Sequence, residues 1–403
     1  MSVRTDSTFR IVIICPQYYP EKGAAASRMG KLASGLKARG VDVKVITPLP
    51  NYPTGKIFPD YRGKLLHTET IDEIPVTRFS LYPSNSANAF KRILNMVSMS
   101  VMLLLALPTL YRARPQVVIL NSPPLPFVVS ALLLSRMIRA RVVTNVSDIW
   151  PMSALDLGAI SKGRVYSVLE RLEGTIYRKS DAVSAQSNET LQHILDQCSD
   201  KKTFLYRNLD PVSEHAFEYP SMQQRPVKIV YAGLLGVAQD VFEICRSVDF
   251  RGMAVEFHIF GDGNQHERIA SYVSENPESN IFLHDSVPKS EMPDVLSEFH
   301  GTIIPLKSHI KGAFPSKIYM AIAASLPILF CGAGEGAEFV RQNRTGWVSD
   351  PGDYAGLAAN IKTLAEMQNE EYQRMRKHIS ALANDQYDLD KQLDLYLTFL
   401  RDA

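Results

Sequence analysis

IVIICPQYYPEKGAAASRMGKLASGLKARGVDVKVIT, residues 11–47, carries the pattern that decides the fold. The β-branched run 11–15 predicts a buried strand, and the apolar positions Met29, Leu32 and Leu36 fit one face of a helix that ends at Gly40. A second strand is predicted at 41–47. A strand–helix–strand unit of this kind predicts a parallel sheet that is covered by helices on both faces.

The same alternation runs through the rest of the chain. Strands are predicted at 116–121, 141–150 and 181–187, and after a polar, proline-bearing connection at 208–226 also at 227–233, 255–263, 280–286, 301–306 and 327–331. We therefore expect two doubly wound Rossmann-like α/β domains, residues 1–215 and 216–385, and a last helical stretch, 386–403, that crosses back to the first domain. Ligands of such sheets bind at the carboxyl ends of the strands, so two facing domains predict a binding cleft there.

Composition points to a soluble enzyme-sized protein. The chain has 403 residues, of which 45% are hydrophobic and 21% charged. Its four cysteines are far apart, which argues against a zinc cluster or a disulfide framework and favours a reducing cytoplasm. The N-terminal residues lack the apolar core of a signal peptide. We expect a cytoplasmic protein without a metal or a cofactor.

Charge is distributed unevenly along the chain. Residues 1–215 hold 27 Lys and Arg against 17 Asp and Glu, although the net charge of the chain is only +2. The segment between Glu73 and Asp148 has no acidic residue and eight basic ones: Arg78, Lys91, Arg92, Arg112, Arg114, Arg136, Arg139 and Arg141. This pattern favours an anionic partner for the first domain, with an ordinary solvated face as the alternative.

An apolar segment lies inside this basic region. Residues 90–114 have an apolar centre, 93–107, with basic residues at both ends. The centre is shorter than the ~20 residues of a membrane span. It predicts either a helix that lies on an anionic membrane surface or a buried helix of the domain.

In the second domain, four turns that suit an anion follow predicted strands or begin predicted helices. Each could also be an ordinary structural turn. P-loop and G-x-G-x-x-G signatures are missing from the positions where they would bind phosphate or a dinucleotide, so a nicotinamide or flavin cofactor is not expected. The residues of these turns are Gly233 and Gly236; Gly261, Asp262 and Gly263; Pro315, Ser316 and Lys317; and Gly332, Gly334, Glu335 and Gly336.

Lys317 is the most informative of these residues. It lies in the first turn of a predicted helix, where a positive charge opposes the helix dipole. A bound anion would offset both charges. The sequence therefore predicts that an anion such as a phosphate binds beside Lys317.

Eight ordered motifs, spread over nearly the whole chain, resemble the bacterial family 4 glycosyltransferases with the GT-B fold. The NYPTG element and the Ser-Pro-Pro that begins at Ser122 resemble a branch that builds O-antigen, capsule and colanic-type polysaccharides and includes proteins assigned as fucosamine transferases. The eight motifs are ICPQYYPEKGAAASRMGKLASGLKARGVDVKVIT, PNYPTGKIFPDYRG, SDIWP, RNLD, YAGLLGVAQD, FGDG, FPSKIYMAIAASLPI and GEGAEFV.

This resemblance implies retaining transfer of a sugar from a nucleotide diphosphate sugar, with UDP favoured and an N-acetylated deoxyhexosamine as the sugar. The acceptor would be a polyprenyl-diphosphate-linked glycan at the inner face of the cytoplasmic membrane. The donor would bind the second domain, and its implied ligands are Gly233, Gly236, Gln239, Gly261, Asp262, Gly263, Val287, Pro288, Ser316, Lys317, Tyr319, Gly334 and Glu335. Glu335 would contact the donor sugar.

The sequence departs from the family at several of these places. Gly312 and Met320 stand where many members have two glutamates, one of which binds the ribose. Leu234 and Gln239 replace an arginine and a lysine beside the diphosphate, and Ser325 replaces a glycine. Lys317 would then be the main cation for the leaving diphosphate.

Acceptor-side residues are expected at the strand ends of the first domain. Gly23 and Arg28 lie after the first strand, where they would contact a phosphate or simply form a helix-capping loop. Asp148 follows another strand and would orient or deprotonate an acceptor hydroxyl, or else cap the next helix. The remaining acceptor-side candidates are Asn51, Tyr52, Ser122 and Trp150.

Two other functions share this expected fold. A nucleotide-sugar 2-epimerase would need no basic, apolar surface, and the departures at Gly312, Met320, Leu234 and Gln239 would suit a non-catalytic subunit. Nucleic-acid binding is not expected, because no known binding module and no aromatic–basic interleaving is found.

Overall fold

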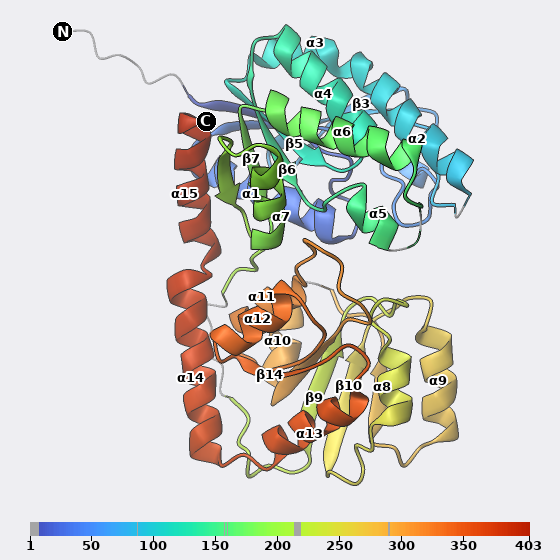
Figure 1. Ribbon diagram of the computed structural model, residues 1–403, viewed down its shortest axis with the longest axis vertical. Helices are drawn as coiled ribbons and strands as arrows, with labels where there is room; N and C mark the ends of the chain where they lie inside the picture. Colours follow the sequence, from blue (N-terminus) through green and yellow to red (C-terminus); the bar gives the residue numbers. More distant parts are fainter. Residues whose placement is uncertain (1–7, 87, 157, 159, 213–218, 289–290) are drawn as a thin grey trace, which may run out of the picture. The chain divides into compact units, whose positions relative to one another are not determined.

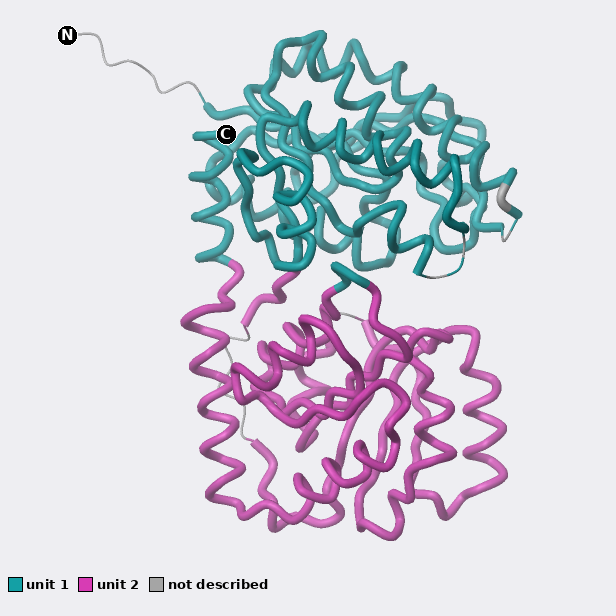
Figure 2. Tube along the Cα trace, viewed as in Figure 1, with its two compact units in different colours: residues 1–207, 311–313, 390–403 teal, residues 208–310, 314–389 magenta. Residues whose placement is uncertain are grey.

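The computed structural model describes residues 8–86, 88–156, 158, 160–212, 219–288 and 291–403. The chain divides into two compact units (Figure 2). Unit 1 comprises residues 1–207, 311–313 and 390–403, and unit 2 comprises 208–310 and 314–389. The predicted boundary between residues 215 and 216 falls within 213–218, outside the described residues. The chain returns to unit 1 after Leu389, whereas we predicted this return between residues 385 and 386. The return comes later because Leu389 packs against a core of unit 2.

Within its described residues, unit 1 contains an eight-stranded sheet in the order β3-β4-β2-β1-β5-β6-β7-β8 (Figure 1). The strands are β1 Arg10–Ile14, β2 Asp42–Pro48, β3 Leu66–Ile71, β4 Ile74–Phe79, β5 Val117–Ser122, β6 Arg141–Val146, β7 Ala182–Ala185 and β8 Lys202–Leu205. The helices are α1 Ala24–Ala38, α2 Ala89–Met102, α3 Leu107–Ala113, α4 Leu125–Met137, α5 Met152–Asp156, α6 Arg164–Lys179, α7 Asn188–Gln197 and α15 Leu389–Asp402, with short 3₁₀ turns at Pro59–Tyr61 and Leu103–Ala106.

The core of unit 1 lies mainly between the sheet and the layer formed by α2, α4 and α6. Central strands such as β5 are buried along their whole length, which explains their continuous apolar sequence. The helix predicted after the first strand is confirmed: α1 buries Met29, Leu32 and Leu36. The last helix, α15, belongs to unit 1 from Asp390 onward, and its Tyr396 hydroxyl lies 3.0 Å from Ser184 Oγ.

One part of this sheet differs from the predicted parallel arrangement. Strands β3 and β4 pair antiparallel through a tight hairpin, in which Ile71 lies opposite Ile74. Asp72 and Glu73 form its turn at φ 49° and 60°, values that a two-residue hairpin requires. The prediction was incomplete here because Asp-Glu is not a turn pair that sequence rules recognise.

Unit 2 contains, within its described residues, a six-stranded parallel sheet in the order β11-β10-β9-β12-β13-β14. The strands are β9 Val227–Ala232, β10 Val255–Phe260, β11 Ile281–His284, β12 Gly301–Pro305, β13 Ile328–Cys331 and β14 Gly346–Ser349. The helices are α8 Val241–Ser247, α9 His266–Glu275, α10 Met292–Ser297, α11 Lys317–Ala323, α12 Glu335–Gln342, α13 Tyr354–Ala365 and α14 Asn369–Gln386.

Both faces of this second sheet are covered. Helices α8, α9 and α13 pack on one face, and α10, α11, α12 and α14 pack on the other. The strand order reverses between β9 and β12 in unit 2, as it does between β1 and β5 in unit 1. Ligands bind doubly wound sheets at such switch points, so the residues that follow these strands define the candidate site of each unit.

Candidate functional site

In unit 2 the glycine turns after β9 and β10 are bonded to each other. Gly233 N donates to Phe260 O at 2.8 Å, and Leu235 N donates to Asp262 O at 2.9 Å. A Cβ on Gly261 would lie 1.9 Å from Gly233 O, and one on Gly263 would lie 2.6 Å from Leu235 O. Any side chain at these two glycines would therefore separate the turns.

Lys317 lies directly against this pair of turns. It is the first residue of α11, and Ser316 is the N-cap. Its Nζ donates to Tyr231 Oη at 2.5 Å and lies 3.7 Å from the centre of the Tyr231 ring. The Tyr231 hydroxyl in turn donates to the carbonyl of Leu234 in the β9 turn. A Cβ on Gly233 would lie 2.8 Å from Nζ, so the glycine makes room for the amine.

Burial changes the acid–base behaviour of this amine. The pKa of Lys317 is lowered from 10.5 to about 7, because burial removes hydration from the charged form. Among the described residues, no carboxylate contributes to offset this loss. A bound diphosphate would supply the missing negative charge and favour the protonated amine.

The turn at the start of α12 lies close to the segment that follows β12. Gly334 has φ +76°, and a Cβ there would lie 2.3 Å from the His309 ring. Glu335 is the first residue of α12. Lys307 also follows β12: its N–H donates to Ala238 O at 2.8 Å and its Nζ lies 2.9 Å from Asp240 Oδ2. Our sequence analysis missed Lys307 and His309, although both come directly after a predicted strand.

The predicted donor ligands outside the glycine turns lie in loops or in the core of unit 2. Val287 and Pro288 belong to the loop after β11, where Val287 is half-buried and Pro288 is exposed. The Oε1 of Gln239 lies 2.7 Å from where a Cβ on Gly236 would be. Tyr319 is buried within an aromatic cluster that contains Phe314, Phe339 and Tyr387.

Gly312, one of the two positions where the family resemblance implies glutamates, has a local structural role. It has φ +82°, and a Cβ there would lie 2.6 Å from Thr190 Oγ1 and 2.7 Å from Ile149. Its N–H donates to Glu189 Oε2 at 2.7 Å, and its carbonyl accepts from Ser187 Oγ at 2.8 Å. A glutamate at this position would require the loop to move.

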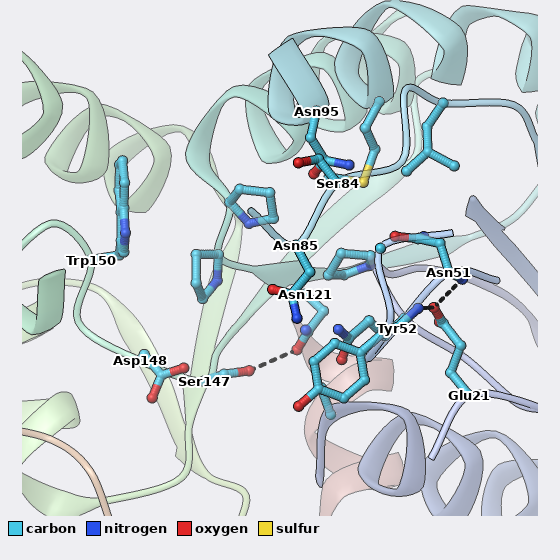
Figure 3. A pocket seen from close by; sticks show the side chains of 18 residues that line it. Glu21, Asn51, Tyr52, Ser84, Asn85, Asn95, Asn121, Ser147, Asp148 and Trp150 are labelled. Carbon is cyan, nitrogen blue, oxygen red and sulfur yellow. Dashed lines mark hydrogen bonds between the residues drawn. The ribbon is translucent and has the colours of Figure 1, made fainter. Parts of the chain in front are cut away.

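Unit 1 contains a cavity of about 410 Å³ at the carboxyl ends of β1, β2, β5 and β6 (Figure 3). Four predicted acceptor-side residues line it: Asn51, Tyr52, Asp148 and Trp150. The other lining residues are Pro16, Gln17, Glu21, Ala25, Gly55, Leu81, Ser84, Asn85, Asn95, Met99, Asn121, Pro123, Pro124 and Ser147.

The other three predicted acceptor-side residues lie beside this cavity. A Cβ on Gly23 would contact the Tyr52 ring at 3.2 Å, and Ser122 is buried next to the lining residue Pro123. Arg28 is buried below the lining residues. It donates to Gln186 Oε1 at 2.5 Å and to Ser147 Oγ. Arg28 therefore supports the wall of the cavity.

Glu21 holds two loops of the cavity together, and the sequence analysis did not single it out. Its buried carboxylate accepts hydrogen bonds from the backbone N–H groups of Tyr18, Asn51 and Tyr52, the last two at 2.8 Å. These bonds favour the charged form, yet the pKa of Glu21 is raised because burial is the larger effect.

Asp148 is the exposed carboxylate of the cavity. Although the side chain keeps contact with solvent, the protein that surrounds the carboxyl group raises its pKa above the ordinary value, and the nearby Arg28 guanidinium opposes this change. A carboxylate with a raised pKa, at a cavity that admits a ligand, is suited to accept a proton from a hydroxyl. Among the described residues, no group of three or more His, Cys, Asp or Glu side chains could hold a metal ion.

The apolar segment of unit 1 is exposed along one stripe. Residues Phe90–Ala113, which form α2, a 3₁₀ turn and α3, are long and apolar enough to cross a membrane. The opposite stripe belongs to the core of unit 1 through Met99, Leu103 and Leu110. The exposed large residues are Phe90, Ile93, Leu94, Val97, Val101, Leu104 and Tyr111.

The eight basic residues of the acid-free segment do not share one surface. Arg78 is fully buried, and it forms an ion pair with Glu69 and donates to the carbonyl of Tyr19. Arg136 pairs with Asp181, and Arg141 donates to backbone carbonyls at the C-terminus. The eight basic residues counted in the sequence thus include Arg78, Arg136 and Arg141, whose side chains bind other residues of unit 1.

Comparison with known proteins places both units in one family. Residues 23–202 match the model of the glycosyl transferase 4-like domain, and residues 228–367 match that of glycosyl transferases group 1. A curated relative, named as the colanic acid biosynthesis glycosyl transferase WcaI of Escherichia coli K12, is 22% identical over 331 residues, which are 78% of this chain and 81% of that protein.

Solved structures show the same fold. HepE of Anabaena in complex with UDP superposes with a TM-score of 0.69 at 12% identity, covering 98% of this chain and 100% of that one. The lipopolysaccharide outer core galactosyltransferase WaaB superposes with a TM-score of 0.63 at 14% identity, covering 97% and 99%. With both units matched by family models, the chain belongs to the family 4 glycosyltransferases of the GT-B fold.

Proposed function

We propose that this enzyme transfers a sugar from a nucleotide diphosphate sugar, which binds unit 2, to a lipid-linked glycan acceptor, whose terminal sugar binds unit 1. The reaction belongs to cell-surface polysaccharide biosynthesis and retains the configuration of the transferred sugar. The observation that carries the proposal is the position of Lys317, whose Nζ is held by Tyr231 against the glycine turns at the switch point of unit 2.

The chemistry of the donor site follows from this lysine. Negative charge develops on the diphosphate as the bond between sugar and phosphate breaks, and a fixed cation stabilises that charge. The N-terminus of α11 adds its partial positive charge at the same place. Glu335 at the start of α12 is the proposed contact of the donor sugar.

UDP is the proposed nucleotide, and an N-acetylated deoxyhexosamine is the proposed sugar. Support for UDP comes from two fold relatives solved with UDP, HepE and TarM. The sugar rests on the resemblance to the branch that includes fucosamine transferases, and the relative named for colanic acid biosynthesis supports the same pathway class.

The acceptor is proposed to lie in the unit 1 cavity, with Asp148 orienting or deprotonating its reactive hydroxyl. A polyprenyl diphosphate carrier would keep this acceptor at the inner face of the cytoplasmic membrane. The exposed apolar stripe of α2 and α3 supports a peripheral attachment there. Lys91 at one end of the stripe and Arg112 at the other would contact anionic headgroups.

Peripheral attachment fits the packing better than a membrane span does. Moving Phe90–Ala113 into the hydrocarbon would remove Met99, Leu103 and Leu110 from the core of unit 1. Each such side chain is worth roughly 1.5–3 kcal/mol when buried. The exposed stripe can enter the headgroup region without that loss.

Calorimetry with the full chain tests the donor assignment. We expect UDP to bind and GDP to bind much more weakly, and Lys317→Ala to weaken UDP binding. A matched set of UDP sugars, with and without the N-acetyl and 6-deoxy groups, then tests the sugar by thermal shift, because specific binding raises the melting temperature. Tight GDP binding without a response to UDP would reject the nucleotide. Free UDP-sugar epimerised in the absence of acceptor would instead indicate a 2-epimerase.

A further inference from the structure

The unit 1 cavity contains no cation. Among the 18 described residues that line it there is no Lys and no Arg, although unit 1 as a whole is rich in both. Its two carboxylates are Glu21 and Asp148. Glu21 is occupied by backbone N–H groups, so Asp148 is the carboxylate that remains for a ligand. The nearby cation, Arg28, lies behind the lining, where it bonds to Gln186 and Ser147, so a negatively charged ligand group would meet Asp148 without a cation in the lining itself.

Three asparagines of the lining have their amide nitrogens fixed by the protein. Asn51 Nδ2 donates to Leu49 O at 3.1 Å, Asn85 Nδ2 donates to Pro53 O at 2.6 Å, and Asn95 Nδ2 donates to Tyr82 O at 2.7 Å. If these amide groups were turned over, each Oδ1 would face a backbone carbonyl oxygen. The nitrogen must therefore be the atom that faces the backbone. The Oδ1 atoms of these three residues have no donor among the described residues, and they remain available to a ligand.

Asn121 also lines the cavity, but it offers its amide nitrogen instead of its oxygen. Its Oδ1 accepts from Asn145 Nδ2 at 2.9 Å and from Ser147 Oγ at 3.0 Å, so its amide nitrogen is the atom left for a ligand. The cavity thus offers free amide oxygens as acceptors, beside the donor groups of Gln17, Ser84, Tyr52 and Trp150. Sugar hydroxyls, which both donate and accept, can use this whole set, whereas carboxylates and phosphates, which only accept, cannot satisfy the amide oxygens.

Two aromatic side chains line the same space. Tyr52 and Trp150 both border the cavity, and Figure 3 shows Trp150 on one side of Asp148 and Tyr52 on the other. Aromatic rings commonly provide apolar surface and a polar edge together. They can pack against the C–H faces of a sugar ring while the amide oxygens accept its hydroxyl protons.

We propose that the unit 1 cavity selects an uncharged sugar as the terminal residue of the acceptor, and that the carrier's diphosphate stays outside it. This inference rests on the proposed function. A uronic acid or a phosphorylated sugar in the cavity would meet Asp148 and the amide oxygens of Asn51, Asn85 and Asn95 without a cation in the lining to compensate.

A cation for the carrier lies on the same helix stripe as the cavity wall. Asn95 and Met99 of α2 line the cavity, and Arg92 precedes them by one turn at the i, i+3, i+7 spacing. Arg92 is half-buried and has no ion-pair partner among the described residues. Its guanidinium is suited to a phosphate of the carrier, between the sugar in the cavity and the apolar stripe of α2.

Ligand-observed NMR with the full chain tests the selection. The probes are methyl glucoside and methyl glucuronide, which share one ring and differ only in the carboxylate at C6. We expect the glucoside to bind and the glucuronide to bind at least about tenfold more weakly or not at all, because its carboxylate would face Asp148. Asp148→Asn should reduce this discrimination. Equal binding of the two probes, stronger binding of the glucuronide, or binding of neither overturns the proposal.

Two variants locate the binding. Asn95→Leu keeps the branched shape of the side chain, removes the amide and should abolish the glucoside signal. Asn360→Leu, a matched change on the half-buried face of α13 in unit 2, should not affect it. An unchanged signal in Asn95→Leu rejects the cavity as the site. UDP calorimetry on the same samples separates the outcomes: loss of UDP binding contradicts the proposed function, whereas UDP binding without sugar selection contradicts only this inference.

Discussion

The two candidate sites occupy equivalent places in similar sheets and yet have opposite electrostatics. In unit 2, glycine turns surround a lysine amine, whereas in unit 1 amide oxygens and a carboxylate line a cavity without cations. In the reaction that we propose, this difference would serve the two ends of a glycosyl transfer. The leaving diphosphate gains negative charge and needs a cation, and the attacking hydroxyl loses a proton and needs an acceptor.

The comparison also shows what one architecture leaves open. Parallel strands bring their carboxyl ends to one edge, and the switch point there forms a site in both units. The strand cores are interchangeable apolar runs, but the residues just after them are not. Function in this fold is therefore decided by a few residues that follow the strands.

The largest expected effect comes from removing the cation of unit 2. Lys317→Ala should lower kcat/KM by roughly 10²–10³, the scale of one lost electrostatic contact to a transition state. Steady-state kinetics with the identified donor measures this. Lys362→Ala, which removes an exposed helix lysine of the same unit, is the control and should have no effect. Near-normal turnover in Lys317→Ala would contradict the assignment of Lys317 as the cation that distinguishes the unit 2 site from the unit 1 site.

A second expected effect concerns the surface of unit 1. Arg112→Glu combined with Arg114→Glu should weaken binding to anionic vesicles by at least about 30-fold, since each basic residue near the leaflet contributes about 1 kcal/mol and each glutamate adds repulsion. Both side chains are exposed at the end of α3, so the fold should persist. Co-sedimentation with phosphatidylglycerol vesicles at low salt measures the binding, and added salt should release the protein.

Arg246→Glu combined with Arg251→Glu is the matched control, because both residues are exposed on unit 2. This control should leave vesicle binding unchanged. Equal sedimentation of the unchanged protein with neutral and anionic vesicles would contradict the electrostatic attachment of unit 1.

A third effect uses pH to separate the sites. The pKa of Lys317 is about 7 without ligand, and a bound diphosphate should raise it, so UDP binding takes up a proton. Affinity should be full below pH 7 and should fall by about tenfold per pH unit above it. Calorimetry from pH 6 to 9 measures this. Lys317→Arg stays charged throughout and should lack the additional fall. Identical profiles of the two proteins would show that Lys317 does not titrate in the binding step.

The lowered pKa of Lys317 also makes the free energy of unfolding depend on pH, and this dependence has the opposite sign to that of UDP affinity. Between about pH 7 and the unfolded pKa of 10.5, the unfolded chain binds a proton at Lys317 that the folded protein lacks. Its contribution to the free energy of unfolding therefore rises with pH across this window.

The smallest expected effect concerns how α11 ends. Ser325 has φ 53° and closes the helix, with its N–H donating to Ile322 O and that of Leu326 donating to Ala321 O. Glycine is favoured at such a position. Ser325→Gly should raise the free energy of unfolding by ~1 kcal/mol, as measured by urea denaturation. Lower stability would indicate that the buried serine makes a compensating contribution.

Much of the fold could be predicted from local patterns. The apolar runs and the helix face of Met29, Leu32 and Leu36 correctly predicted β1, α1 and β2, because parallel strands buried on both faces need continuous apolar sequence. The glycine turns were also found at the strand ends. The β3–β4 hairpin was missed, since its turn pair, Asp72 and Glu73, carries no recognised signal.

The sequence by itself determined the alternation of strands and helices, the family, and the presence of Lys317 at a helix start. These depend on spacing along the chain. Only the tertiary structure decided which charges are available: Arg78 and Arg28 are buried, Glu21 is occupied by backbone N–H groups, and Lys317 loses its hydration. The physical reason is that hydration and hydrogen-bond partners come from residues distant in sequence, so the charge that a side chain presents is a property of the folded chain.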